Sequence, residues 1–160
     1  MKRAATIGVY GWTADAWLAA LSDANVGQVL DVRQRRGVRG SRYPWANARR
    51  LQAMLEQAGI DYRHHRELAP TTELRQLQYR EDDRQGVGKR SRVALAPEYV
   101  ERYTHEILDR VDLRPIAAEM PDGAASVLLC VERDPEACHR YLIAERLEAE
   151  GLARVAHLRP

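Results

Sequence analysis

The segment between positions 126 and 151 is the part of the sequence richest in residues that could do chemistry. It carries two thiols, a carboxylate, an imidazole and a guanidinium, at Cys130, Cys138, Glu132, His139 and Arg140. A thiolate can act as a nucleophile, a carboxylate or imidazole can move protons, and a guanidinium matches the geometry of phosphate and carboxylate groups. The segment therefore predicts a polar site.

The elements around this segment indicate how it is positioned. Residues 126–131 are apolar on both faces, which is typical of a central strand in a parallel sheet. The run Asp134-Pro135-Glu136 predicts the start of a helix that continues to Glu150. We expect free amide groups at that start to attract an anion and to shift Cys138 toward its thiolate form.

Strand-like and helix-like patterns alternate along the whole chain. Strands are expected at 4–10, 28–32, 60–64, 126–131 and 154–158, and helices at 13–24, 45–58, 72–82, 97–111, 112–120 and 134–150. This alternation predicts a single-domain, three-layer α/β fold: a mostly parallel five-stranded Rossmann-like sheet with helices on both faces. The expected strand order is 3-2-1-4-5. One domain spans 1–160, and within it 67–96 is expected to be a charged, mobile loop or lid.

Ligands of such sheets bind at the carboxyl ends of the strands. Because residues two apart on a strand share a face, Asp31 should pair with Arg33 and Cys130 with Glu132. The residues expected to do chemistry are Asp31, Cys130, Glu132, Cys138 and His139. The residues expected to bind an anionic substrate are Tyr10, Arg33, Ser41, Arg42, His64 and Arg140.

The stretch from Asp31 to Glu56 is strongly basic, although the formal net charge of the 160-residue chain is only +2. It contains no acidic residue between its two ends, and its arginines are Arg33, Arg35, Arg36, Arg39, Arg42, Arg49 and Arg50. The stretch is either a solvated loop or an anion-binding surface, because guanidinium groups bind phosphate well.

Several short motifs, taken together, resemble the bacterial and archaeal family called domain of unknown function 488. The matching pieces are 6–8, 31–33, 41–42 and 59–64, followed by Leu128-Leu129-Cys130-Val131-Glu132, Pro135 and Cys138-His139-Arg140. The resemblance spans nearly the whole chain, and the Cys-x-Glu…Cys-His-Arg signature is its most specific part. It implies the α/β fold and the polar site, and it implies no particular reaction.

Three functions are compatible with these residues. The first is a hydrolase or transferase acting on a small anionic substrate, phosphate-bearing or nucleotide-like, with Glu132 or Asp31 moving protons and a cysteine as nucleophile. The second is a nucleic-acid-binding or regulatory module that uses the surface of Arg33–Arg50. The third is thiol or sulfur-transfer chemistry on Cys130 and Cys138, for which Asp31-Val32-Arg33 and a cysteine ending a strand give a loose likeness to rhodanese-type domains.

No metal and no cofactor are predicted, because the spacing of the two cysteines and the histidine matches none of the usual zinc motifs. The sequence has no long apolar run and no signal-like start, so we expect a cytoplasmic protein without a membrane partner. The oligomeric state is left open.

Overall fold

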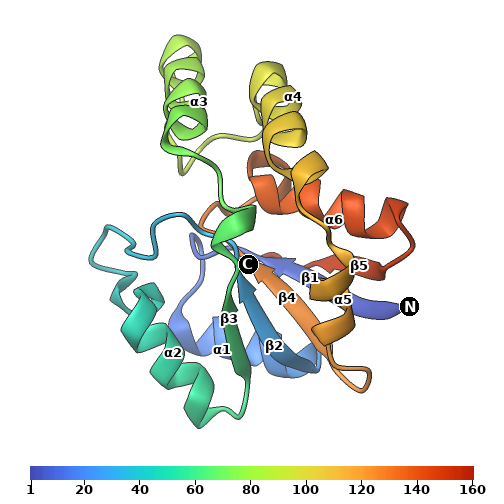
Figure 1. Ribbon diagram of the computed structural model, residues 1–160. Coiled ribbons are helices and arrows are strands. Elements are labelled where there is room, and N and C mark those ends of the chain that lie inside the picture. Colours follow the sequence, from blue (N-terminus) through green and yellow to red (C-terminus); the bar gives the residue numbers. More distant parts are fainter.

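A five-stranded sheet forms the centre of the molecule, and the computed structural model describes residues 1–160 (Figure 1). The strands are β1 (Lys2–Ile7), β2 (Val26–Asp31), β3 (Asp61–His64), β4 (Ala125–Leu129) and β5 (Ala153–His157). Every pair of neighbouring strands is parallel. The predicted α/β class is therefore confirmed.

Helices cover both faces of the sheet, and two further helices lie beyond the carboxyl ends of its strands. Helices α1 (Ala14–Asp23) and α2 (Ala48–Gln57) cover one face, and α5 (Arg114–Glu119) and α6 (His139–Ala149) cover the other, as right-handed crossovers require. Helices α3 (Thr72–Gln85) and α4 (Pro97–Glu106) rise past the carboxyl ends of the strands. Single 3-10 turns occur at Pro44–Ala46, Arg66–Leu68, Leu108–Arg110 and Pro135–Ala137.

The strand order is β3-β2-β4-β1-β5, so the predicted order 3-2-1-4-5 is wrong in its interior. The prediction placed β1 and β2 side by side because consecutive strands usually neighbour one another. Instead β4 lies between them, and all five of its residues are buried. The edge strands β3 and β5 alternate between more and less exposed residues, which suits an edge position.

The helix expected to start at Pro135 begins later. Residues Pro135–Ala137 form a single 3-10 turn, Asp134 makes no capping hydrogen bond with its side chain, and α6 begins at His139. The predicted start of this helix at Pro135 is therefore wrong. By contrast, Thr13 caps α1, because its hydroxyl accepts a hydrogen bond from the amide of Ala16 at 3.2 Å.

The charged segment 67–96 lies at the carboxyl ends of the strands. It contains helix α3, and the residues after α3 include Arg92, whose side chain is buried. The Arg92 guanidinium donates to Asp82 at 2.7 Å and to Glu132 at 2.9 Å. Movement of this segment as a lid stays a prediction.

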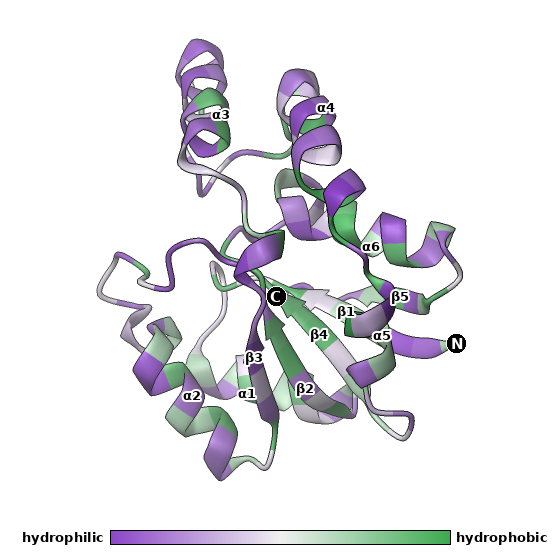
Figure 2. Cartoon of the chain, viewed as in Figure 1, coloured by the Kyte–Doolittle hydropathy of each residue, from purple (hydrophilic) through white to green (hydrophobic).

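Hydrophobic residues gather in the middle of the sheet. In Figure 2 the strands β2 and β4 are largely hydrophobic, whereas β3 and the loop that follows β2 are hydrophilic. The core includes Trp17 of α1, whose indole N–H donates to the carbonyl of Gly8 at 3.1 Å. None of the helices is both long and apolar enough to span a membrane.

A buried polar network closes the carboxyl end of β2. The Asp31 carboxylate accepts hydrogen bonds from the Arg33 amide at 3.1 Å and from the Arg33 side chain at 2.9 and 2.8 Å. It also accepts one from the Tyr62 hydroxyl at 2.5 Å. Both of its oxygens are therefore occupied, and the pair holds the start of the arginine-rich loop against the sheet.

We predict that the Tyr62 hydroxyl titrates late and that the fold loses stability as it does. Burial, followed by the charge of Asp31 and its hydrogen bond, raises the pKa of Tyr62 to about 12. Because the neutral hydroxyl is favoured in the folded state, this stabilisation is complete below pH 10 and is lost between about pH 10 and 12. Ultraviolet titration of the wild type against Tyr62→Phe measures the pKa. A Tyr62 hydroxyl that titrates near pH 10 in the wild type would contradict the prediction.

Gly8 is expected to tolerate no side chain. A Cβ atom at this position would lie 2.0 Å from the carbonyl oxygen of Glu132, where the loop after β4 crosses β1. Gly8→Ala should therefore lower the free energy of unfolding by about 2 kcal/mol or more, measured by urea denaturation. Gly123→Ala is the matched control, because nothing lies within 4 Å of the added carbon there. Equal stability of the two variants would refute this prediction.

Candidate functional site

A small cavity of about 50 Å³ lies at the carboxyl ends of β2 and β4. The sheet side contributes Cys130 and Glu132, and the start of α6 contributes Cys138 and His139. Residues of α3 and α4 and of the segment between them close the other side, namely Arg75, Gln78, Tyr79, Lys89, Arg92, Leu95 and Tyr99. A wider groove of about 390 Å³ adjoins the cavity and shares several of these residues.

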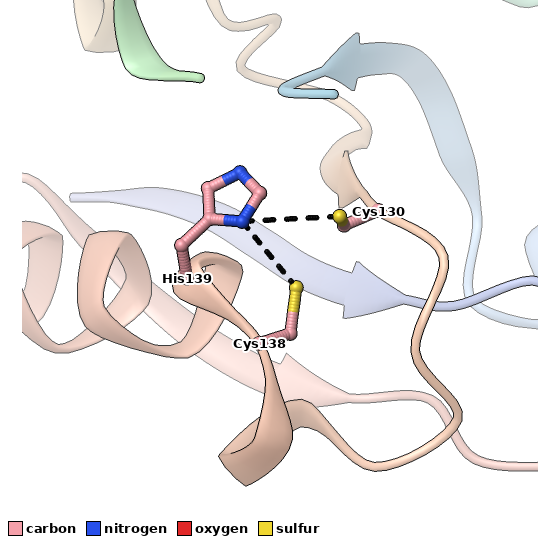
Figure 3. Close-up of side chains that lie close together, drawn as sticks. All are labelled: Cys130, Cys138 and His139. Atoms are coloured by element: carbon pink, nitrogen blue, oxygen red, sulfur yellow. Dashed lines mark hydrogen bonds between the residues drawn. The ribbon is translucent and has the colours of Figure 1, made fainter. Parts of the chain in front are cut away.

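Two thiols and an imidazole meet on one wall of this cavity (Figure 3). His139 Nδ1 lies 3.8 Å from Cys130 Sγ and 3.6 Å from Cys138 Sγ. The Cys130 thiol donates to Glu132 Oε2 at 3.3 Å. These four residues were all predicted as catalytic candidates, and the fold brings them together.

The His139 ring is fixed by its other nitrogen. Nε2 lies 2.7 Å from the carbonyl oxygen of Val32, which can only accept, so Nε2 carries a proton. Nδ1 therefore faces the two sulfur atoms. Burial alone would lower the pKa of His139, but the charge of Cys138 and its hydrogen bond, with the Val32 carbonyl and Glu132, raise it.

The two thiols differ in how readily they ionise. Burial, together with the neighbouring Cys138 and Glu132, raises the pKa of Cys130 well above its ordinary value. Burial also opposes ionisation of Cys138, yet the neighbouring Cys130 thiol and the charges of His139 and Arg140 outweigh it and lower the pKa of Cys138. When only one thiol of the pair is ionised, it is Cys138.

Glu132 is held by a buried ion pair. Its partner is Arg92, which donates to Glu132 Oε1 at 2.9 Å, and neither Arg140 nor Arg33 pairs with it. The second oxygen, Oε2, accepts only from the Cys130 thiol. Oε2 can therefore accept a further hydrogen bond from a substrate or a water molecule in the cavity.

Three cations line the cavity without any acidic partner. Arg75 donates only to the neutral groups of Gln34 and Tyr79, at 2.8 and 3.0 Å. The ammonium of Lys89 makes no hydrogen bond or ion pair, and Arg35 is exposed without one. Burial would lower the pKa of Lys89, but the charges of Glu132 and nearby phenol and thiol groups raise it, so the ammonium stays charged.

The residues predicted to bind an anion are spread over the carboxyl edge. Arg33 lines the cavity but is engaged by Asp31, and Tyr10 lines the adjoining groove. His64 lies outside both hollows and bonds to the Arg33 carbonyl at 2.9 Å. Ser41 and Arg42 are exposed and line neither hollow.

Arg140 is buried behind the site and does not line the cavity. Its Nη2 donates to the carbonyl of Arg133 at 3.3 Å, and its Nε and Nη1 have no hydrogen-bond partner. No carboxylate pairs with it. The role of Arg140 suggested by this placement is to compensate negative charge on the cysteines, because its charge favours the ionised form of both.

The sequence patterns did not reveal the residues that the segment 67–96 contributes to the site. Arg75 lies in the helix expected at 72–82, and Lys89 and Arg92 lie in the charged stretch after it, where no periodic pattern indicates which way a side chain points. One signal was available: Lys89 is one of only two lysines in a chain that otherwise uses arginine.

Comparison with known proteins gives one match. A model of the family described as "Domain of unknown function DUF488" matches residues 13–147, which include all four cavity residues that carry thiol, carboxylate and imidazole groups. Neither the curated proteins nor the solved structures give a significant match. Since the matched residues make up most of the chain, the protein belongs to the DUF488 family.

Proposed function

We propose that the protein is an enzyme that acts on a small anionic substrate, phosphate-bearing or nucleotide-like, in the cavity above Cys130, Glu132, Cys138 and His139. The observation that carries this proposal is the set of three cations, Arg35, Arg75 and Lys89, that line the cavity without an acidic partner.

Uncompensated cations at a partly buried site point to an anionic ligand. Most buried or half-buried charges elsewhere in the chain are paired, such as Arg33 with Asp31 and Arg92 with both Asp82 and Glu132. Lys89 is partly buried and lies near Glu132, yet its ammonium donates to nothing. Holding a charge out of water without a partner is costly, so a ligand that supplies the partner binds favourably.

The size of the cavity suits one anionic group. Its volume of about 50 Å³ holds roughly three to five water molecules, which is comparable to a phosphate group. The adjoining groove, lined in part by Tyr10, Tyr79 and Arg39, offers room for the rest of a larger substrate. A planar group such as a nucleobase could stack on these phenol rings.

The wall opposite the cations carries the groups that would do chemistry. Glu132 has one oxygen bonded only to a thiol and can accept or return a proton, and the sulfur atoms and His139 lie beside it. A substrate anion held by Arg75 and Lys89 would place its neighbouring atoms over this wall. Hydrolysis and group transfer both fit this arrangement.

We predict that inorganic phosphate and adenosine monophosphate bind in this cavity. Because each cation supplies a charge-assisted bond, Arg75→Gln and Lys89→Gln should each weaken binding by about tenfold or more, measured by calorimetry. Arg49→Gln is the matched control, because Arg49 is an exposed arginine outside both hollows. In a screen of phosphate esters and nucleotides, Glu132→Gln should abolish turnover and keep the fold.

Three results would contradict the proposed anion site or the role of Glu132. If neither ligand binds at millimolar concentration, or if Arg49→Gln weakens binding as much as Lys89→Gln, the cavity is not an anion site. Normal turnover by a folded Glu132→Gln variant would show that the Glu132 carboxylate takes no part in the reaction.

A second candidate, nucleic-acid binding, is favoured by the exposed arginines that follow β2. Arg39, Arg42, Arg49 and Arg50 are exposed, and none forms an ion pair. Arg39 also lines the groove beside the cavity, so a backbone phosphate could reach both. Nucleic acid is therefore the alternative partner of this surface.

This alternative predicts salt-dependent binding of a DNA or RNA duplex. Four phosphate contacts would reduce the affinity by about 100-fold between 50 and 200 mM salt, because bound counterions are released. The double variant Arg42→Glu/Arg49→Glu should abolish the interaction, whereas Arg110→Glu, on the 3-10 turn Leu108–Arg110, should not. Absent binding, or binding insensitive to salt, would exclude this function.

Thiol or sulfur-transfer chemistry on Cys130 and Cys138 stays a prediction. It requires that at least one of the two sulfur atoms is free of any ligand in the active protein.

A further inference from the structure

Three potential metal ligands converge in the candidate site. Cys130 follows β4, and Cys138 and His139 form the start of α6 (Figure 3). Their ligand atoms, two Sγ and one Nδ1, all lie within 4.8 Å of one another. The strand order makes this possible, because β4 beside β2 places the loop and α6 over the end of both strands.

His139 is oriented as a metal ligand usually is. Its Nε2 donates to the Val32 carbonyl at 2.7 Å, which fixes the tautomer and turns the Nδ1 lone pair toward the two sulfur atoms. Histidines that bind metals almost always donate their second nitrogen to such an acceptor. This outer contact links β2 to the cluster.

The spacing fits a tetrahedral ion. Zinc binds sulfur at about 2.3 Å and nitrogen at about 2.0–2.1 Å, so ligand atoms around it lie about 3.5–3.8 Å apart. The two nitrogen–sulfur distances, 3.6 and 3.8 Å, already have this value. The two sulfur atoms lie within 4.8 Å of each other, so both are close enough to approach one ion.

The charge and chemistry of the donors select the ion. Thiolate and imidazole ligands suit zinc and other thiophilic ions, whereas magnesium and calcium prefer oxygen. Two ionised cysteines in a buried site need compensating positive charge. A divalent cation would balance both charges, and the buried Arg140, which has no carboxylate partner, would further favour the ionised thiols.

We propose that Cys130, Cys138 and His139 bind a zinc ion, with the fourth position open to the cavity. All three residues line that cavity, as does Glu132, so a water molecule or substrate oxygen could take the fourth position. An open position is typical of catalytic rather than structural zinc. The idea that this zinc serves catalysis depends on the proposed function, whereas zinc binding itself does not.

The experiment measures metal binding by the full chain. The protein is stripped with a chelator under reducing conditions and titrated with Zn²⁺ in competition with a chromophoric chelator, and separately with Co²⁺. We expect one zinc per chain, together with the near-ultraviolet thiolate-to-cobalt bands and intense visible bands of a tetrahedral cobalt site. Cys130→Ser, Cys138→Ser and His139→Ala should each weaken zinc binding by about 100-fold or more.

His64→Ala is the matched control, because His64 also donates to a backbone carbonyl, that of Arg33, but lies outside the cluster. It should keep the affinity for zinc. If a cysteine variant fails to fold, by circular dichroism, the cobalt spectrum of the wild type still reports thiolate ligation directly.

Several outcomes would overturn the zinc site. These are substoichiometric zinc, a cobalt spectrum without thiolate bands, affinity unchanged in Cys138→Ser, or equal loss in His64→Ala. Two thiols that react freely with a disulfide reagent in the presence of zinc would instead indicate thiol chemistry. Phosphate binding by the metal-free protein is measured separately with Arg75→Gln and Lys89→Gln, so the anion site and the zinc site can fail independently.

Discussion

The position of β4 between β1 and β2 is the constraint on which the site depends. It places Cys130 beside the end of β2, where the carbonyl of Val32 can accept the hydrogen bond of His139. Had β1 lain there instead, the two strands that carry most of the polar residues would have been separated by a third. In the observed strand order, the loop after β4 passes close to the end of β1, and Gly8 provides the space for it.

Buried charge governs how the cavity is assembled. Asp31 and Arg33 neutralise each other at the end of β2, and Arg92 ties the segment after α3 to Glu132 across 40 residues of sequence. Such pairs add little net stability in general, but removing one partner is costly, so they favour one arrangement of the segments. These charges have protein partners, whereas the ammonium of Lys89 has none and is free to bind a ligand anion.

Local sequence rules predicted one part of the site. The period of a strand put Cys130 and Glu132 on one face, and the structure places them in contact. The strand order depended on which parallel strands pair, a long-range choice that local patterns do not determine. Lys89 and Arg92 reach the cavity because α3, α4 and the segment between them lie at the carboxyl ends of the strands, and no periodic pattern in that charged segment indicated it.

A crystal structure of the protein soaked with inorganic phosphate tests most directly whether the cavity is an anion site. We predict phosphate density in the cavity, within hydrogen-bond distance of Arg75 and Lys89 and above Cys130 and Glu132. Both cations paired with protein carboxylates, with phosphate absent from the cavity or bound only at the exposed arginines after β2, would contradict the proposed function.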